Sequence, residues 1–269
     1  MVTDRRAPIG VFDSGIGGLT VVHELRRQLP GERLIYFGDT ARVPYGPKSP
    51  DTVRRYALEI TEWLLAHGVK AVVVACNTAT AHALNTLRER FTLPIIGVIE
   101  PGARAAVRAS SSGRIGVIGT AGTVASGAYE RAIHGLRADA HVFAIACPLF
   151  VPLVEEGWLA TEPTRLIARA YLDPLAADRV DALVLGCTHY PLLKPLLAQV
   201  VGADVRLIDS AEETAAATRE ALDAAALRAP DDAEGECRFI ASDAPDQFLR
   251  AGQRFLGDAI ARVEKVTLG

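Results

Sequence analysis

The sequence reads IGVFDSG over residues 9–15 and IGVIGTA over residues 115–121. In both stretches an apolar run of strand length ends in small or polar residues that favour a turn. A second pair is also alike, because residues 72–78 read VVVACNT and residues 183–189 read LVLGCTH. Similar lengths of chain separate the members of each pair, so the sequence predicts two similarly built halves. For the first pair alone, a chance likeness between two buried strands stays open.

Short apolar runs alternate with helical patterns along the whole chain, as is typical of a layered α/β fold. Runs this apolar favour strands that are buried on both faces of a mostly parallel sheet. One helical pattern covers residues 53–64, where apolar residues recur every three or four positions, and Ser49 followed by Pro50 predicts its N-cap and first residue. The predicted strands are Ile9–Phe12, Leu34–Phe37, Ala71–Ala75, Ile95–Ile99, Ile115–Ile118, Val142–Ala146, Ala182–Leu185, Val205–Ile208 and Phe239–Ala241.

The length of 269 residues exceeds that of a usual single domain. No Gly/Ser-rich linker divides the chain, and the one polar stretch that favours flexibility is 228–236. We therefore expect the domain boundaries in short loops near Glu100-Pro101 and near Asp209-Ser210, where Ser210 to Glu213 form a capping box that begins a long helix. The predicted first domain is 1–99 with 210–269, and the predicted second domain is 100–209.

The composition is that of a globular protein that acts on small molecules. Apolar residues make up 49% of the chain and the formal net charge is −3, so no excess of basic residues favours nucleic acid or a membrane surface as a partner. The N-terminus is polar, and no run of about 20 apolar residues predicts a signal peptide or a membrane span. We therefore expect a cytoplasmic protein.

The four cysteines are widely spaced and form no CxxC pair, which is unlike a disulfide scaffold or a structural zinc site. Cys76 and Cys187 each follow an apolar strand at the point where a helix is expected, and a helix N-terminus favours the thiolate. The alternative for any cysteine is a buried small apolar residue. That alternative is the better interpretation for Cys147 and Cys237, which lack polar neighbours.

Asp13 ends the first predicted strand and is followed by a glycine-rich turn that lets a ligand approach the backbone. A phosphate-binding loop is the alternative, but the turn has neither the P-loop lysine nor the full G-x-G-x-x-G spacing, and a carboxylate repels phosphate. We expect Asp13 to accept a proton or to bind an ammonium group. The loop after the second strand carries Tyr45 and Gly46, which offer a phenol and backbone donors; a simple surface turn is equally consistent with it.

His189 lies two residues after Cys187 and could relay the proton of that thiol. A Cys-x-His metal site is the alternative, although no second pair of ligands with zinc-like spacing is evident. Glu155 and Glu156 follow an apolar segment, and one of them could face a cleft, whereas the default for such a pair is a solvated helix end.

Five motifs resemble, in the same order, those of the glutamate racemase family, within the broader aspartate/glutamate racemase superfamily. The resemblance extends from about residue 8 to about residue 256. The motifs are Gly10–Thr20, Pro44–Gly46, Ala75–Ala79, Cys147–Glu155 and Leu185–Pro191.

The resemblance implies two pseudosymmetric α/β domains, each a mostly parallel sheet flanked by helices, with the active site in the cleft between them. It implies that Cys76 and Cys187 act on opposite faces of the α-carbon of glutamate, usually on the D- and the L-enantiomer respectively, without a cofactor or a metal. Inversion by proton exchange needs a base on one face and an acid on the other, which one thiol cannot supply. The D-glutamate formed would serve peptidoglycan synthesis and so the cell wall.

The resemblance also assigns roles to further residues. Asp13 would assist Cys76, while His189 and a glutamate would assist Cys187; the family pattern favours Glu155 over Glu156. The residues that would bind substrate are Asp13, Ser14, Tyr45, Gly46, Asn77, Thr78, Thr188 and His189.

Two alternatives stay open from the residues alone, and a third, a racemase that uses pyridoxal phosphate, is disfavoured. A racemase that uses pyridoxal phosphate needs a lysine for the Schiff base, and none of the four lysines directly ends a predicted strand. A thiol hydrolase would use Cys187 with a histidine base, and a hinged binding protein would use two similar lobes without catalysis. Homodimer formation, effector regulation and a side activity on aspartate also stay open.

Overall fold

The chain consists of two compact units. A computed structural model describes residues 4–268, without the side chain of Asp258. Unit 1 comprises Met1–Val98 and Ala211–Gly269, and unit 2 comprises Ile99–Ser210. Residues 1–3 and 269, which the predicted first domain includes, lie outside the described residues.

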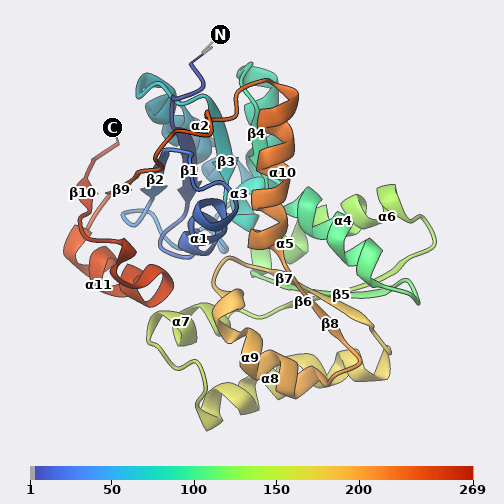
Figure 1. Cartoon of the computed structure of the whole chain (residues 1–269). Coiled ribbons are helices and arrows are strands. Elements are labelled where there is room, and N and C mark those ends of the chain that lie inside the picture. Colours follow the sequence, from blue (N-terminus) through green and yellow to red (C-terminus); the bar gives the residue numbers. More distant parts are fainter. Residues whose placement is uncertain (1–3, 269) are drawn as a thin grey trace. The chain divides into compact units, whose positions relative to one another are not determined.

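Unit 1 contains a six-stranded sheet in the order β10-β9-β2-β1-β3-β4 (Figure 1). Neighbouring strands pair in parallel throughout, and all residues of β1, β2 and β3 are buried. Burial of both faces explains why these segments read as unbroken apolar runs. The strands are β1 (Ile9–Asp13), β2 (Leu34–Gly38), β3 (Ala71–Val74), β4 (Ile95–Gly97), β9 (Cys237–Ala241) and β10 (Glu264–Lys265).

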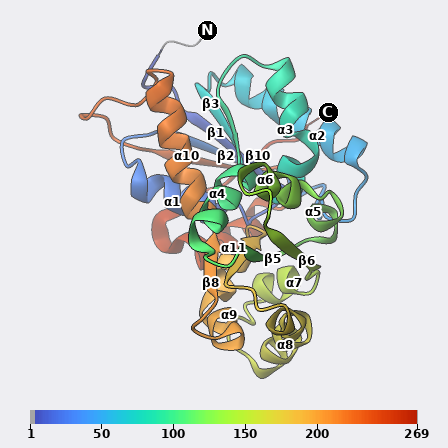
Figure 2. The ribbon, with the colours of Figure 1, turned by 90° about the vertical axis from the view of Figure 1, so that its right-hand side faces the viewer.

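Helices cover both faces of this sheet, with α2 and α3 on one side and α1 on the other (Figure 2). The apolar positions of α2 that the periodicity predicted, from Val53 to Leu64, are fully buried in one cluster with side chains of α3 and the sheet. Each large side chain buried in this way contributes about 1.5–3 kcal/mol. The helices are α1 (Leu19–Gln28), α2 (Pro50–Ala66), α3 (Asn77–Arg90), α10 (Ser210–Ala224), α11 (Pro245–Leu256) and the 3-10 helix η2 (Gly257–Ala259).

Unit 2 contains a four-stranded parallel sheet in the order β6-β5-β7-β8. Its strands are β5 (Arg114–Gly119), β6 (His141–Ala146), β7 (Ala182–Gly186) and β8 (Arg206–Asp209). Its helices are α4 (Ile99–Ala109), α5 (Ala121–Ala125), α6 (Ala128–Leu136), α7 (Phe150–Glu155), α8 (Glu162–Ala177), the 3-10 helix η1 (Tyr190–Leu193) and α9 (Lys194–Val201).

The two sheets repeat one topology. In unit 1 the first four strands along the chain lie in the order β2-β1-β3-β4, and in unit 2 the corresponding four lie in the order β6-β5-β7-β8. The stretches 9–15 and 115–121 both contain the first strand of their set, while Cys76 and Cys187 both follow the third. The predicted fold class, with two similar α/β halves, is therefore confirmed.

Most of the local predictions hold, but the short loop expected near Asp209-Ser210 is absent, because β8 ends at Asp209 and α10 begins at Ser210, and there are further exceptions. Ser49 caps α2 as expected, because its hydroxyl accepts a hydrogen bond from the backbone N–H of Thr52, with Pro50 at the first position. The first of the further exceptions is the loop expected at Glu100-Pro101, which is wrong because these residues form the first turn of α4, where the missing N–H of proline costs nothing. The second is the strand expected up to Ile99, which ends at Gly97. The third is β10, which the sequence did not predict.

Candidate active site

Asp13 and Cys76 come from neighbouring strands of unit 1. β1 pairs with β3 so that Phe12 lies opposite Val74, and the N–H of Ala75 donates to the carbonyl of Phe12 over 2.9 Å. Asp13 ends β1 and Cys76 follows β3, so both lie at the carboxyl edge of the sheet. Ligands of open α/β sheets bind at this edge.

The Cys76 sulfur lies at the N-terminus of α3. Cys76 is the N-cap residue, and its Sγ accepts a hydrogen bond from the N–H of Ala79 over 3.4 Å. The hydroxyl of Ser14 lies 3.8 Å from the same sulfur. The partial positive charge of a helix N-terminus stabilises a thiolate, so this sulfur is suited to exchange a proton.

The glycine-rich turn fixes the carboxylate of Asp13. Its Oδ2 accepts from the N–H of Gly15 over 3.0 Å, and the carbonyl of Gly15 accepts from the hydroxyl of Tyr36 over 2.8 Å. A Cβ atom at Gly18 would lie 2.6 Å from the Cβ of Asp13, so only glycine fits there. Burial, followed by the charges of Asp13 and Cys76, raises the pKa of Tyr36 well above its ordinary value, which keeps the phenol a neutral donor.

The loop with Tyr45 and Gly46 follows β2 and contains a cis peptide bond between Val43 and Pro44. Tyr45 is buried, so the alternative of a surface turn with this ring outside is wrong. Its hydroxyl donates to Oδ2 of Asp39. The phenol is thus already engaged inside unit 1.

In unit 2 the corresponding thiol lies beside a histidine, and this histidine contacts a carboxylate. Cys187 directly follows β7, and its Sγ lies 3.9 Å from Nδ1 of His189. Nε2 of His189 lies 3.0 Å from Oε1 of Glu155, at the end of α7. Glu156 is the exposed C-cap of that helix. Of the two candidate glutamates, Glu155 is thus the one that contacts His189.

His189 is positively charged near neutral pH. Burial alone lowers the pKa of this imidazole, but hydrogen bonds to Cys187 and Glu155 and the charges of both outweigh burial and raise the pKa to about 10. The protonated imidazole thus places a positive charge beside the sulfur of Cys187. The helix expected directly after Cys187 is instead a turn followed by η1, so the histidine is the positive group that this sulfur faces.

The turn after Cys187 is held by aromatic contacts within unit 2. The hydroxyl of Tyr190 donates to the carbonyl of Cys147 over 2.8 Å, and the ring of Phe150 packs edge-on against that of Tyr190 with centroids 5.3 Å apart. Phe150 belongs to α7, the helix that carries Glu155. These contacts fix the histidine and the glutamate relative to each other.

Of the other two cysteines, Cys147 is buried and Cys237 is partly buried. Burial raises the pKa of Cys147 and of Cys237 to about 12 each, so both are thiols at neutral pH. This agrees with the interpretation that neither residue takes part in chemistry.

The predicted site residues thus fall into two groups. Asp13, Ser14, Tyr45, Gly46, Cys76, Asn77 and Thr78 lie at one edge of the sheet of unit 1, where Cys76 is the N-cap of α3 and Asn77 and Thr78 are its first residues. Glu155, Cys187, Thr188 and His189 belong to unit 2. Asp39, which contacts Tyr45, was not among the predicted site residues. The pattern that could have indicated it is an acidic residue at the carboxyl end of a strand, as at Asp13.

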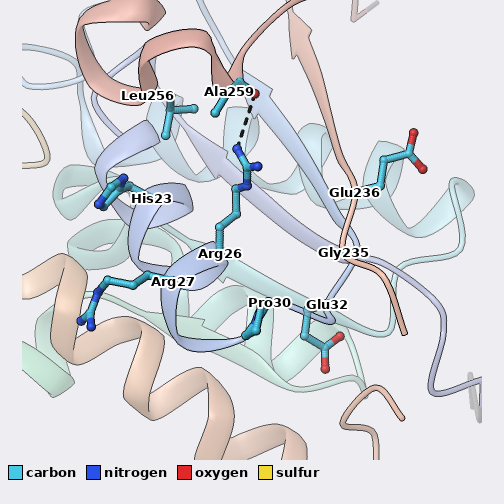
Figure 3. Close-up of a pocket in the computed structure, with 9 residues that line it drawn as sticks. All are labelled: His23, Arg26, Arg27, Pro30, Glu32, Gly235, Glu236, Leu256 and Ala259. Atoms are coloured by element: carbon cyan, nitrogen blue, oxygen red, sulfur yellow. Dashed lines mark hydrogen bonds between the residues drawn. The ribbon is translucent and has the colours of Figure 1, made fainter. Parts of the chain in front are cut away.

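Unit 1 also has a pocket of about 380 Å³ away from these residues (Figure 3). The side chains of His23, Arg26 and Arg27 from α1 line it, and Arg26 reaches the carbonyl of Ala259. None of the predicted site residues lines this pocket. Over residues 4–268, no group of three or more His, Cys, Asp or Glu side chains is arranged to hold a metal ion.

A comparison with protein families gives the class of this molecule. The model of the Asp/Glu/hydantoin racemase family matches residues 9–218. The chain belongs to this family, whose members are isomerases.

Individual relatives are more specific. The glutamate racemase of Geobacter metallireducens is 53% identical over 260 residues, which cover 97% of this chain and 96% of the relative. Glutamate racemase isoform RacE1 from Bacillus anthracis has a similar structure, with a TM-score of 0.93, 41% identity and 98% of each chain covered. The glutamate racemase from Francisella tularensis, solved in complex with D-glutamate, has a TM-score of 0.91, 38% identity and 98% coverage of each chain.

Proposed function

We propose that this protein interconverts L-glutamate and D-glutamate by exchanging the α-proton between Cys76 and Cys187, without a cofactor. One sulfur removes the proton as a thiolate, and the other, as a thiol, delivers a proton to the opposite face of the carbanion. The product would supply peptidoglycan synthesis with D-glutamate. The glutamate racemases to which the chain is similar support this choice of substrate.

The observation that carries the proposal is the equivalent position of the two cysteines. Each follows the third strand of a set of four strands that repeats the same order. Each sulfur also lies beside a group of positive polarity, namely the N-terminus of α3 for Cys76 and His189 for Cys187. A reaction that inverts a stereocentre needs this pair of equivalent groups, whereas a reaction with one nucleophile does not.

The assisting residues follow from the contacts around each thiol. Asp13 would bind the substrate ammonium group and assist Cys76, while Glu155 would hold His189 beside Cys187. The α-proton of an amino acid is very weakly acidic, so the site must also stabilise the carbanion through donors to the substrate carboxylate. Backbone and side-chain donors at Ser14, Gly46, Asn77 and Thr78 and at Thr188 would supply these hydrogen bonds.

Hydrogen exchange at the α-carbon tests this function directly. The protein is incubated with L- or D-glutamate in deuterium oxide without any added cofactor, and proton NMR follows the loss of the α-proton while circular dichroism follows inversion. We expect both exchange and inversion with either enantiomer. No exchange with either enantiomer would refute the proposal.

Cysteine variants test the mechanism. Cys76→Ser and Cys187→Ser should each abolish racemisation, because a serine hydroxyl is a far weaker acid than a thiol. Cys237→Ser is the matched control and should remain active, since this thiol stays protonated in β9.

A thiol hydrolase is the second candidate. In such an enzyme Cys187 would be the nucleophile, His189 the base and Glu155 the carboxylate that orients the histidine. Such an enzyme uses one nucleophile. Full activity after Cys76→Ser would therefore favour the hydrolase over the racemase.

We further propose that units 1 and 2 are the two domains of the enzyme, and that the protein works in the cytoplasm. Over residues 4–268, no helix is both long and apolar enough to cross a membrane. A homodimer is a further hypothesis, which sedimentation of the purified protein tests.

A further inference from the structure

We propose that Asp39 is a positioning residue that holds the loop Arg42–Gly46 in the geometry needed for substrate binding. The inference rests on the proposed function, because that function makes Gly46 of this loop a donor to the substrate. Asp39 itself would touch no substrate and would act through the loop.

The side chain of Asp39 is fully buried and accepts hydrogen bonds from three side chains. Its Oδ2 accepts from the hydroxyl of Tyr45 and, over 2.7 Å, from Nε of Arg42. Its Oδ1 accepts from the hydroxyl of Ser242 over 2.9 Å. Charge-assisted hydrogen bonds of this kind are roughly twice as strong as neutral ones, so a single carboxylate fixes both ends of the loop.

The backbone of Asp39 connects this cluster to the catalytic carboxylate. Its N–H donates to the carbonyl of Asp13 over 3.0 Å, at the point where β1 and β2 end side by side. Ser242, which follows β9, donates its N–H to the carbonyl of Gly38 and accepts from the N–H of Ala41. The ends of three strands and the loop therefore meet at one residue.

The charged and polar groups around Asp39 stabilise its buried carboxylate. The guanidinium of Arg42 also pairs with Glu59 of α2 and lies 4.0 Å above the centre of the Tyr56 ring. Burial, followed by the charge of Asp39, raises the pKa of Tyr45 far above its ordinary value, so the phenol remains a donor. If the loop opened partly, the buried carboxylate would lose some of these partners and its charge would be poorly compensated. The free-energy cost of such a state disfavours partial opening of the loop.

The main test compares Asp39→Asn with Asp51→Asn. Asparagine keeps the shape of the side chain but removes its charge, and its amide group meets the guanidinium of Arg42 as a second donor. Asp51 is the matched control because its side chain is 89% exposed at the start of α2, where it pairs with Arg54 one turn further along. We expect Asp39→Asn to raise KM for glutamate at least tenfold, with a smaller change in kcat, and Asp51→Asn to leave both constants unchanged.

A second measurement does not depend on activity. Hydrogen–deuterium exchange of the amides of residues 40–46 should become at least tenfold faster in Asp39→Asn, while the helix α3 keeps its protection. Tyr45→Phe removes only the hydroxyl that donates to Asp39 and should produce the same changes to a smaller extent, which keeps the test available if Asp39→Asn does not fold. Wild-type turnover separately tests the proposed function.

Two results would overturn the inference. One is a folded Asp39→Asn variant whose KM and loop exchange equal those of the wild type. The other is a variant with a lowered melting temperature and faster exchange in the loop but an unchanged KM, because Asp39 would then serve stability alone.

Discussion

Replacing Glu155 by glutamine should move the alkaline limit of activity to lower pH. The charge of this carboxylate helps to hold the proton on Nε2 of His189, and the amide that replaces it has no charge. His189 would therefore lose its proton at a lower pH, while the length and shape of the side chain at position 155 stay the same.

The size of the shift follows from the exposure of the two partners. The side chain of His189 is 6% exposed and that of Glu155 is 40% exposed, so the pair lies between a buried and a surface interaction. Exposed ion pairs contribute about 0.2–1 kcal/mol, and hydrogen bonds to charged groups about 1.5–3 kcal/mol. An intermediate value of about 1.4 kcal/mol lowers the pKa of His189 by about one unit.

Two assays measure this shift. Carbon-13 NMR of labelled imidazoles follows the titration of His189, which is identified among the six histidines by its absence in His189→Asn. The dependence of kcat/KM on pH should show its alkaline decline about one unit lower in Glu155→Gln. Glu156→Gln is the matched control and should titrate like the wild type, because Glu156 is exposed at the end of α7.

The reasoning fails if His189 titrates identically in the wild type and in Glu155→Gln. It also fails if Glu156→Gln produces an equal shift, because a general loss of negative charge would then explain both variants.

Three further predictions concern the frame around the site. Gly18→Ala places a methyl group 2.6 Å from a neighbouring Cβ and should lower the free energy of unfolding by about 1–3 kcal/mol in urea. A Cβ atom at Gly135 of α6 would meet no neighbouring atom, so Gly135→Ala should raise the free energy of unfolding by about 0.5–1 kcal/mol. Equal effects of the two substitutions would contradict the packing argument. Lys70→Met breaks a buried ion pair and should cost about 3–5 kcal/mol, against less than about 1 kcal/mol for the exposed Arg6→Gln; similar losses would argue against burial as the cause. The wild type should lose stability as pH rises from about 6.5 to about 10, because folded His189 keeps a proton that the unfolded chain releases, and His189→Asn should flatten this decline; an unchanged slope would refute the assignment.

The sequence alone predicted the fold because the signal is periodic and local. Buried parallel strands need apolar residues on both faces, and all nine predicted strands correspond to strands of the structure. The position of Cys76 between a strand and a helix followed from the same pattern. β10 was missed because Glu264 and Lys265 are polar and form a strand of only two residues.

The missing parts of the site depend on contacts between distant segments. Asp39 is held by Ser242, more than 200 positions further along the chain, and no local pattern indicates that pairing. The phenol of Tyr45 was expected to face a ligand, but its bond to Asp39 is visible only after folding. Likewise, the local sequence offered two adjacent glutamates, and the direction of α7 determines that Glu155 reaches His189.

The repeated strand order carries two unlike sets of neighbours, with a helix N-terminus at Cys76 and an imidazolium at Cys187. In the proposed reaction, mirror-image substrates have equal free energies, so kcat/KM must be the same in both directions whatever surrounds each sulfur. The unlike neighbours can therefore make kcat differ between the two enantiomers only if KM differs by the same factor. A protein with two different halves would thus hold its substrates at a one-to-one equilibrium while releasing one of them more slowly than the other.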